Sequence, residues 1–195
     1  MTQLKLGVGI CGSFCSMSKL IKVLEELKSQ NVDLYLFVTP EVQKVNNRFF
    51  RADDLLKRLQ SYSGHAIIDS LAEAETFGPF HQLDAMLLMP CSATTLAKLC
   101  HGISDNAVLL ATKATLRNQR PIIISFYTND ALGNSGVNIM RLLNTKGFYF
   151  VPFGQDDYVH KPNSMTSAES LVVPTLNQAL EGKQIQPVII SYETP

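Results

Sequence analysis

The sequence predicts a three-layer α/β domain with a mostly parallel sheet, and three observations support this prediction. Short, nearly continuous apolar runs recur along the chain, as in parallel strands that are buried on both faces. Amphipathic helical stretches lie between these runs, so strands and helices alternate. The 195 residues are enough for one substantial core, and we see no linker or internal repeat. We therefore expect residues 1–195 to form a single domain with right-handed crossovers.

The apolar runs predict strands at 4–10, 33–38, 84–89, 121–126 and 148–151. The helical periodicity predicts helices at 17–30, 53–62, 94–100, 106–118, 137–144 and 168–180. In the first helix, Leu20, Leu24 and Leu27 fall on one stripe and charged residues lie mostly opposite. Pro121 opens the fourth strand, where its fixed φ angle is tolerated. The segment 151–167 is long for a connection, so we expect a lid or an oligomer arm there.

Composition and charge exclude several classes of function. The chain has 17 basic and 17 acidic residues, so no global field would attract nucleic acid or an anionic membrane. No apolar run reaches the roughly 18 residues of a membrane span, and we see no export signal, so we expect a cytoplasmic protein. The four cysteines lack zinc-finger spacing, which predicts no metal site. Cys11 and Cys91 each follow a predicted strand and could lie close together as reduced, buried thiols.

The first strand carries three glycines that allow two interpretations. Gly7, Gly9 and Gly12 spell G-x-G-x-x-G, the pattern of a dinucleotide-binding turn. Alternatively the strand passes through Gly7 and Gly9, and only Gly12 and Ser13 belong to a phosphate-holding loop. A dinucleotide fold needs a carboxylate about 20 residues further on, at the end of the second strand. Asp33 stands at the wrong end of that strand, so the sequence favours a mononucleotide.

In the mononucleotide interpretation, Gly12 lets the backbone approach an anion and the Ser13 hydroxyl donates to it. The helix that opens near Met17 adds its free N–H groups and its positive dipole end. A tight turn that binds no ligand remains the alternative.

A second group of polar residues follows the third strand, in Pro90-Cys91-Ser92-Ala93-Thr94-Thr95. Its hydroxyls either bind a flat, polar-edged ligand or cap the helix that follows. With Gly12, Ser13 and Thr39, this stretch resembles the flavoprotein family of homo-oligomeric FMN-containing cysteine decarboxylases. The resemblance implies a Rossmann-like flavoprotein fold, with part of the FMN site supplied by a neighbouring copy of the chain. The implied cofactor-binding residues are Gly12, Ser13, Thr39, Ser92, Ala93, Thr94 and Thr95.

Two departures from the decarboxylase pattern bear on function. Thr94 stands where the family motif has asparagine, and the loop 39–50 lacks the histidine that the decarboxylases carry after the second strand. Decarboxylation of a cysteinyl substrate is therefore disfavoured. A binding or helper protein that kept the scaffold and lost FMN remains an alternative, and so does the dinucleotide enzyme that the glycine pattern suggests.

The later motifs T-N-D-A-L-G (128–133), P-F-G-Q-D-D (152–157) and K-P-N-S-M (161–165) resemble the B-subunit family of dipicolinate synthase. This resemblance implies one chain of an oxidoreductase in the mother cell of a sporulating bacterium. The enzyme would oxidise a dihydrodipicolinate-level intermediate to pyridine-2,6-dicarboxylate. The partner would be the A subunit of the synthase, a dehydrogenase-like chain that carries NADP. The B subunit would itself form a trimer or a dodecamer.

A dicarboxylate substrate needs cations and amides around it. The loop residue Arg48 and the pair Asn129 and Asp130 after the fourth strand are the predicted substrate-binding residues, although Asx-turn capping also explains the pair. Aromatisation also needs a base. Of the four histidines, His160 in the long loop is the least ordinary, but the sequence assigns no catalytic residue.

Overall fold

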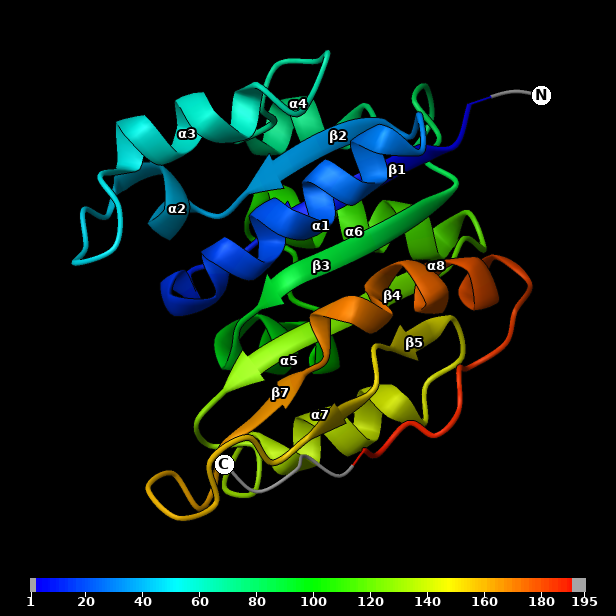
Figure 1. The fold of residues 1–195 in the computed structure, drawn as a ribbon. Helices are drawn as coiled ribbons and strands as arrows, with labels where there is room; N and C mark the ends of the chain where they lie inside the picture. The colour runs from blue at the N-terminus through cyan, green and yellow to red at the C-terminus, as the bar shows by residue number, and fades with distance from the viewer. Residues whose placement is uncertain (1–2, 191–195) are drawn as a thin grey trace.

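A computed structural model describes residues 3–190, and it shows a seven-stranded sheet between two layers of helices (Figure 1). The strands are β1 (Lys5–Ile10), β2 (Asp33–Val38), β3 (Ala85–Cys91), β4 (Ile122–Thr128), β5 (Phe148–Phe150), β6 (Phe153–Gly154) and β7 (Met165–Ser167). Their order is β2-β1-β3-β4-β7-β6, and β5 also pairs with β4. All pairings among β1 to β5 are parallel, and only those of β7 are antiparallel. The predicted three-layer α/β class is confirmed.

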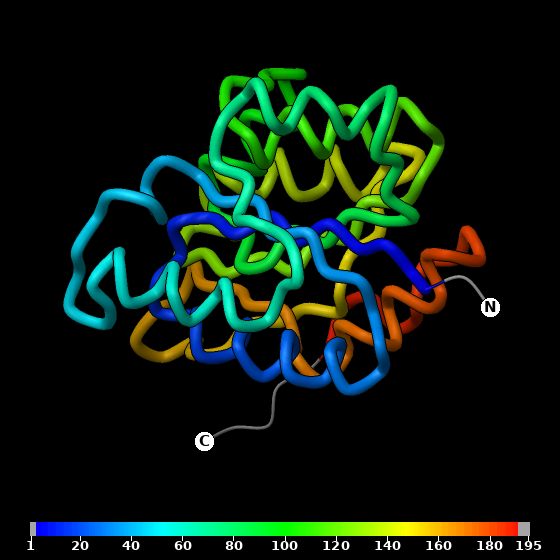
Figure 2. The backbone as a smooth tube through the Cα atoms, turned by 90° about the horizontal axis from the view of Figure 1, so that it is seen from above, coloured from blue at the N-terminus to red at the C-terminus, as the bar shows by residue number. Residues whose placement is uncertain are grey.

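The helices are α1 (Met17–Ser29), α2 (Pro40–Lys44), α3 (Ala52–Gln60), α4 (Leu71–Glu75), α5 (Ala93–Cys100), α6 (Ala107–Arg117), α7 (Gly136–Leu143) and α8 (Val172–Leu180). Buried residues of α1, α2, α3 and α8 pack on one face of the sheet, and those of α4, α5, α6 and α7 pack on the other. The view from above shows these two layers on either side of the strands (Figure 2). Continuous burial on both faces explains why the strands are apolar along their whole length.

The structure departs from the predicted elements in three places. The short helices α2 and α4 were not expected, because five residues are too few to show a helical period. The helix expected at 168–180 is a 3₁₀ turn (Glu169–Leu171) followed by α8. The segment 151–167 is not all connection: β6 and β7 form an antiparallel pair that extends the sheet. These strands are too short to show a period in the sequence.

The two glycines of β1 lie within the strand, so the strand does pass through Gly7 and Gly9. A Cβ atom on Gly9 would lie 2.6 Å from Cδ2 of Leu88 and 2.7 Å from Cγ1 of Val108. A Cβ atom on Gly7 would lie 2.6 Å from atoms of two neighbouring side chains. Both glycines are therefore required by close packing in the core.

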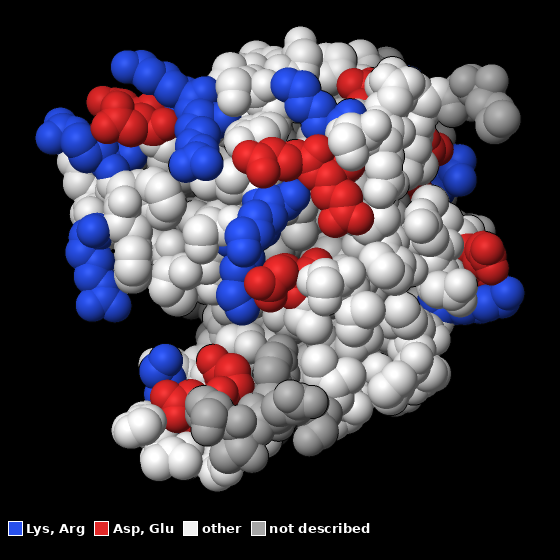
Figure 3. Space-filling model, in the orientation of Figure 1, with Lys and Arg blue, Asp and Glu red and all other residues white. Residues whose placement is uncertain are grey.

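The surface carries no dominant sign of charge on the face shown in Figure 3, where acidic and basic side chains are interspersed. Within residues 3–190, no helix combines the length and the apolar character needed to cross a bilayer.

Candidate functional site

The candidate site is a small cavity at the carboxyl ends of β1, β2 and β3. In parallel sheets, ligands bind at this edge because the loops after successive strands meet there. The cavity measures about 160 Å³. It is lined by Gly12, Thr39, Glu41, Ser92, Thr94, Thr95, Lys98 and Asn106. Folding thus brings three segments from distant parts of the sequence around one polar space.

The Thr39 hydroxyl is the most informative group in this cavity. Thr39 follows β2 and is 3 % exposed. Its backbone is fully engaged: the N–H donates to the carbonyl of Ile10, and its own carbonyl accepts from Val42. Its Oγ1, however, is the only buried side-chain polar atom without a hydrogen-bond partner in the described part of the chain. A buried hydroxyl without a hydrogen bond lowers the stability of the fold by about 1–3 kcal/mol. A ligand in the cavity that bonds to the Thr39 hydroxyl would recover this free energy, so the hydroxyl is well suited to bind one.

The residues after β3 combine two roles. Ser92 is the N-cap of α5: its Oγ accepts the backbone N–H of Thr95 at 3.3 Å and lies 3.0 Å from the Thr95 hydroxyl. The capping interpretation of this stretch is therefore confirmed, yet both residues also line the cavity. Thr94 lines it as well and is exposed, whereas Ala93 does not contribute to the wall.

The loop after β1 supplies one cavity residue and one structural contact. Gly12 lines the cavity, and a Cβ atom there would lie 3.3 Å from Cβ of Glu41. The Ser13 hydroxyl instead donates to the backbone carbonyl of Tyr127 at 3.2 Å, which ties this loop to β4. A 3₁₀ turn (Phe14–Ser16) separates Ser13 from the start of α1. Ser13 therefore lies outside the cavity wall in this structure.

Two charged side chains stand in the wall, and neither is among the site residues predicted from the sequence. Glu41 is exposed, and Lys98 makes a 2.7 Å ion pair with Asp105. An anion in the cavity would be attracted by Lys98 and repelled by Glu41. Lys98 could have been found from its spacing, because it is four residues after Thr94 on the same helix and therefore shares its face.

Two buried thiols lie behind the cavity wall. The backbone N–H of Cys11 donates to the carbonyl of Pro90 at 3.2 Å, which sets Cys11 beside the end of β3 and confirms that Cys11 and Cys91 are neighbours. A hydrogen bond from the Cys91 thiol lowers the pKa of Cys11 below that of an ordinary thiol. Burial raises the pKa of Cys91 well above its usual value.

The predicted substrate residues lie on other loops of the same edge. Arg48 is exposed, with its guanidinium carbon 4.7 Å from the centre of the Phe49 ring. Asn129 is exposed, and the Asp130 carboxylate accepts hydrogen bonds from Thr128 and from Ser135, the latter at 2.8 Å. Asp130 thus holds the turn after β4. None of these three lines the cavity of a single chain.

The histidines do not converge on the cavity. His160 is exposed, and its Nδ1 lies 3.1 Å from Oδ1 of Asp157 in the loop between β6 and β7. His65 pairs with Asp33 at 2.7 Å, at the opposite end of β2. His101 follows α5 as its C-cap residue. Within residues 3–190, no three His, Cys, Asp or Glu side chains gather closely enough to hold a metal ion.

This fold, with a polar cavity above β1, β2 and β3, defines the class of protein. Residues 1–151 match the family described as Flavoprotein, so the chain belongs to the flavoprotein family. Within that family it is a homologue of the B subunit of dipicolinate synthase. It is 39% identical to that protein of Bacillus subtilis (strain 168) over 186 residues, which is 95% of this chain and 93% of the relative.

Further comparisons agree with this placement. The crystal structure of the dipicolinate synthase B subunit from Bacillus halodurans C superimposes with a TM-score of 0.89 at 37% identity. That match covers 98% of this chain and 99% of the other. Flavin prenyltransferase UbiX of Thermoplasma acidophilum is 26% identical over 87% of this chain and 91% of its own length. The FMN-dependent cysteine decarboxylase SpaF shares the fold, with a TM-score of 0.67 at 20% identity over 91% of this chain and 97% of that one.

Proposed function

We propose that this chain is the B subunit of a two-chain oxidoreductase that forms pyridine-2,6-dicarboxylate from a dihydrodipicolinate-level intermediate. The observation that carries the proposal is the 39% identity to the dipicolinate synthase B subunit across nearly the whole of both chains. The partner would be a dehydrogenase-like A subunit that carries NADP. The packing role of Gly7 and Gly9 supports this division, because it accounts for the glycine pattern without a dinucleotide turn.

The cavity residues fit one polar end of a mononucleotide. The unpaired Thr39 hydroxyl, the hydroxyls of Thr94 and Thr95 and the ammonium of Lys98 would hold its hydroxyl or phosphate groups. FMN bound there would supply a hydride acceptor. The cavity of about 160 Å³ is smaller than the roughly 300–1,000 Å³ of usual ligand pockets, so a single chain would enclose only part of FMN. This size supports a homo-oligomer, trimer or dodecamer, in which a second copy completes the site.

Two other observations favour a second candidate function, a helper protein that binds no cofactor. Glu41 in the wall opposes an anion, and the Ser13 hydroxyl is engaged by Tyr127. Purified protein that binds FMN and turns yellow would exclude this candidate. Protein that stays colourless in excess FMN while supporting the partner's activity would favour it.

The proposal is tested by reconstitution. The chain alone, the partner alone and their mixture are assayed with NADP for the ultraviolet absorbance of dipicolinate. We expect product from the mixture only. Full activity of the partner alone would show that the reaction does not need this chain, and an inactive mixture would likewise overturn the proposal.

A variant pair shows whether the cavity takes part. Lys98→Gln should lower kcat/KM of the mixture about tenfold, because one charge-assisted contact to an anionic ligand is lost. The matched control is Lys113→Gln, an exposed lysine of α6 that lies outside the cavity wall. Equal activity of the two variants would place the chemistry elsewhere.

A further inference from the structure

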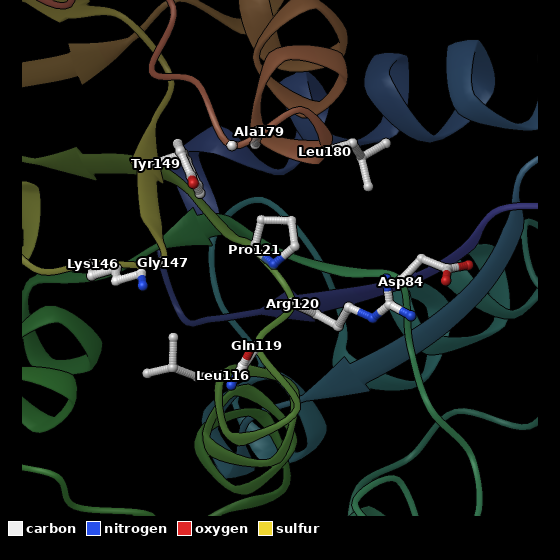
Figure 4. A pocket seen from close by; sticks show the side chains of 11 residues that line it. Asp84, Leu116, Gln119, Arg120, Pro121, Lys146, Gly147, Tyr149, Ala179 and Leu180 are labelled. Atoms are coloured by element: carbon white, nitrogen blue, oxygen red, sulfur yellow. The ribbon is translucent and has the colours of Figure 1, made fainter.

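A larger cavity lies at the opposite end of the sheet. It measures about 470 Å³, within the usual range for sites of small ligands. Its wall comes from the residues that precede β3, β4 and β5 and from the carboxyl end of α8 (Figure 4). The candidate site lies beyond the carboxyl ends of β1, β2 and β3, at the other edge of the same sheet, so the two cavities are separate.

The walls of this cavity combine apolar and polar groups in similar measure. Leu116, Pro121 and Leu180 supply aliphatic surface around its centre (Figure 4). Tyr149 adds an aromatic ring that carries a phenol hydroxyl. A body of hydrocarbon or aromatic carbon would bury these surfaces, and the phenol could bond to a polar group on its edge.

Two cations flank this apolar centre. Arg120 and Lys146 lie on opposite sides of Pro121 (Figure 4), and both are exposed. Neither makes an ion pair within 4.0 Å in the described part of the chain, whereas five other pairs are formed there. Arg120 stands three residues beyond the end of α6, outside the last turn where a helix dipole would account for a cation. Lys146 is therefore available to a ligand, and so is Arg120, whose guanidinium points toward Asp84 in the same wall (Figure 4).

One acidic residue, Asp84, lines the same cavity. Its Oδ2 accepts the backbone N–H of Lys5 at 2.9 Å, so this carboxylate connects β1 to the start of β3. The carbonyls at the end of α6 are likewise engaged: Gln119 N–H donates to Leu116 and Arg120 N–H to Thr115. Arg120 and Lys146 together still exceed the charge of Asp84, which leaves the wall cationic.

We propose that this cavity binds a small dicarboxylate with a flat apolar body, at a site distinct from the candidate reaction site. One carboxylate bonds to the Arg120 guanidinium and the other to the Lys146 ammonium, while the body covers Pro121 and Leu116. Resting on the proposed function, the dicarboxylate that matches this chemistry is the aromatic product, pyridine-2,6-dicarboxylate. The site then acts as a product sensor on the far edge of the sheet.

The test is calorimetric titration of the purified chain at low salt. The probes are pyridine-2,6-dicarboxylate, benzene-1,3-dicarboxylate, which lacks the ring nitrogen, and benzoate, which has one carboxylate. We expect both dicarboxylates to bind, benzoate to bind about tenfold more weakly, and added salt to weaken all three. No binding of either dicarboxylate to the intact chain would overturn the inference.

Matched variants locate the binding. Arg120→Gln and Lys146→Gln should each weaken dicarboxylate binding about tenfold. Lys113→Gln on the exposed surface of α6 and Thr39→Val in the other cavity should leave it unchanged. Binding that survives both cavity variants, or that is lost with Thr39→Val, would show that the ligand occupies another place. A cooperative thermal transition with a midpoint no lower than that of the unsubstituted chain confirms that each variant is folded.

This result can be separated from the reconstitution assay. Binding at Arg120 and Lys146 is measured on the isolated chain and needs no turnover. An inactive mixture with intact dicarboxylate binding would reject the proposed function and keep this site. An active mixture in which this chain binds no dicarboxylate would keep the proposed function and reject this site.

Discussion

Single side chains in this protein take on roles that depend on what their neighbours leave unsatisfied. Thr39, Ser92 and Thr95 all carry hydroxyls at the same cavity. Ser92 and Thr95 bond to each other, so part of their capacity serves the start of α5. The Thr39 hydroxyl has no partner within residues 3–190. At Thr39, the hydroxyl that would bind a ligand therefore also lowers the stability of the ligand-free chain.

Replacing Thr39 by valine should stabilise the ligand-free chain. The substitution keeps the shape of the side chain and removes an unpaired buried hydroxyl, so the free energy of unfolding should rise by about 1 kcal/mol. The control is Thr112→Val, because the Thr112 hydroxyl donates to the carbonyl of Val108 at 2.7 Å. That control should lose about 0.5–1 kcal/mol. Urea unfolding measures both, and equal losses would contradict the structure.

At the scale of elements, a neighbouring strand and a helix pack closely against β1. The strand contacts β3 alongside and α6 above it, and its glycines leave room for side chains of both. Such an approach is available only to a residue without Cβ. The packing of β1 thus explains a glycine pattern that otherwise resembles a nucleotide-binding turn.

Gly9→Ala should destabilise the fold through this packing. The new methyl group would lie within 3.0 Å of Leu88 and Val108, and overpacking of this kind costs about 1–3 kcal/mol. Gly64→Ala is the control, because nothing lies within 4 Å of its new methyl group, and its effect should stay within about 0.5 kcal/mol. Thermal unfolding compares them. A Gly9→Ala protein as stable as the control would show that the side chains around Gly9 are packed more loosely than these distances indicate.

The segment between β6 and β7 has a pH-dependent contact of its own. The backbone N–H of His160 donates to Asp157, and this bond is the largest cause that lowers the pKa of Asp157 below its ordinary value. Because the folded pKa is below the unfolded one, the contact stabilises the loop above the ordinary aspartate pKa. The stabilisation is lost as the pH falls through the lowered pKa.

His160→Ala tests this contact by leaving the backbone donor in place. We expect the Asp157 pKa to stay below its ordinary value, although less so, since the smaller side-chain contribution of His160 disappears. The carboxyl carbon shift, followed by NMR from pH 7 to acid, gives the pKa. A return to the ordinary value would assign the shift to the imidazole instead.

The whole molecule has one sheet with a core on each face, so buried groups near its centre should become accessible only when the sheet unfolds. The four cysteines differ in how deeply they are buried. Cys15 is exposed, Cys100 is partly buried, and Cys11 and Cys91 are buried.

Thiol labelling should therefore proceed in distinct phases. Cys15 should react with a disulfide reagent in the native protein, and Cys100 more slowly. Cys11 and Cys91 should react only at the rate of global unfolding, measured by mass spectrometry across a urea series. Native-state labelling of Cys11 as fast as that of Cys15 would show that the candidate cavity opens locally.

Much of this arrangement could be predicted from the sequence, because buried apolar residues recur with the period of the strand or helix that carries them. The five parallel strands and most helices were found from apolar runs and stripes. The elements α2, α4, β6 and β7 were not found, since two to five residues carry no measurable period. Gly12 and the Ser92 stretch could be predicted because they follow strands, and Thr39 through the family resemblance, whereas Glu41 and Asn106 enter the cavity only through folding.

The sequence by itself determined the alternation of strands and helices, the place of the polar loops at the carboxyl edge and the family to which the chain belongs. These properties depend on local spacing and on short motifs, both of which can be read along the sequence. The tertiary structure alone decided that the Ser13 hydroxyl bonds to Tyr127 and that the Thr39 hydroxyl has no partner within residues 3–190. It also placed Arg120 and Lys146 around one cavity. Such contacts join residues far apart in the chain, and only the packing of the sheet fixes their distances.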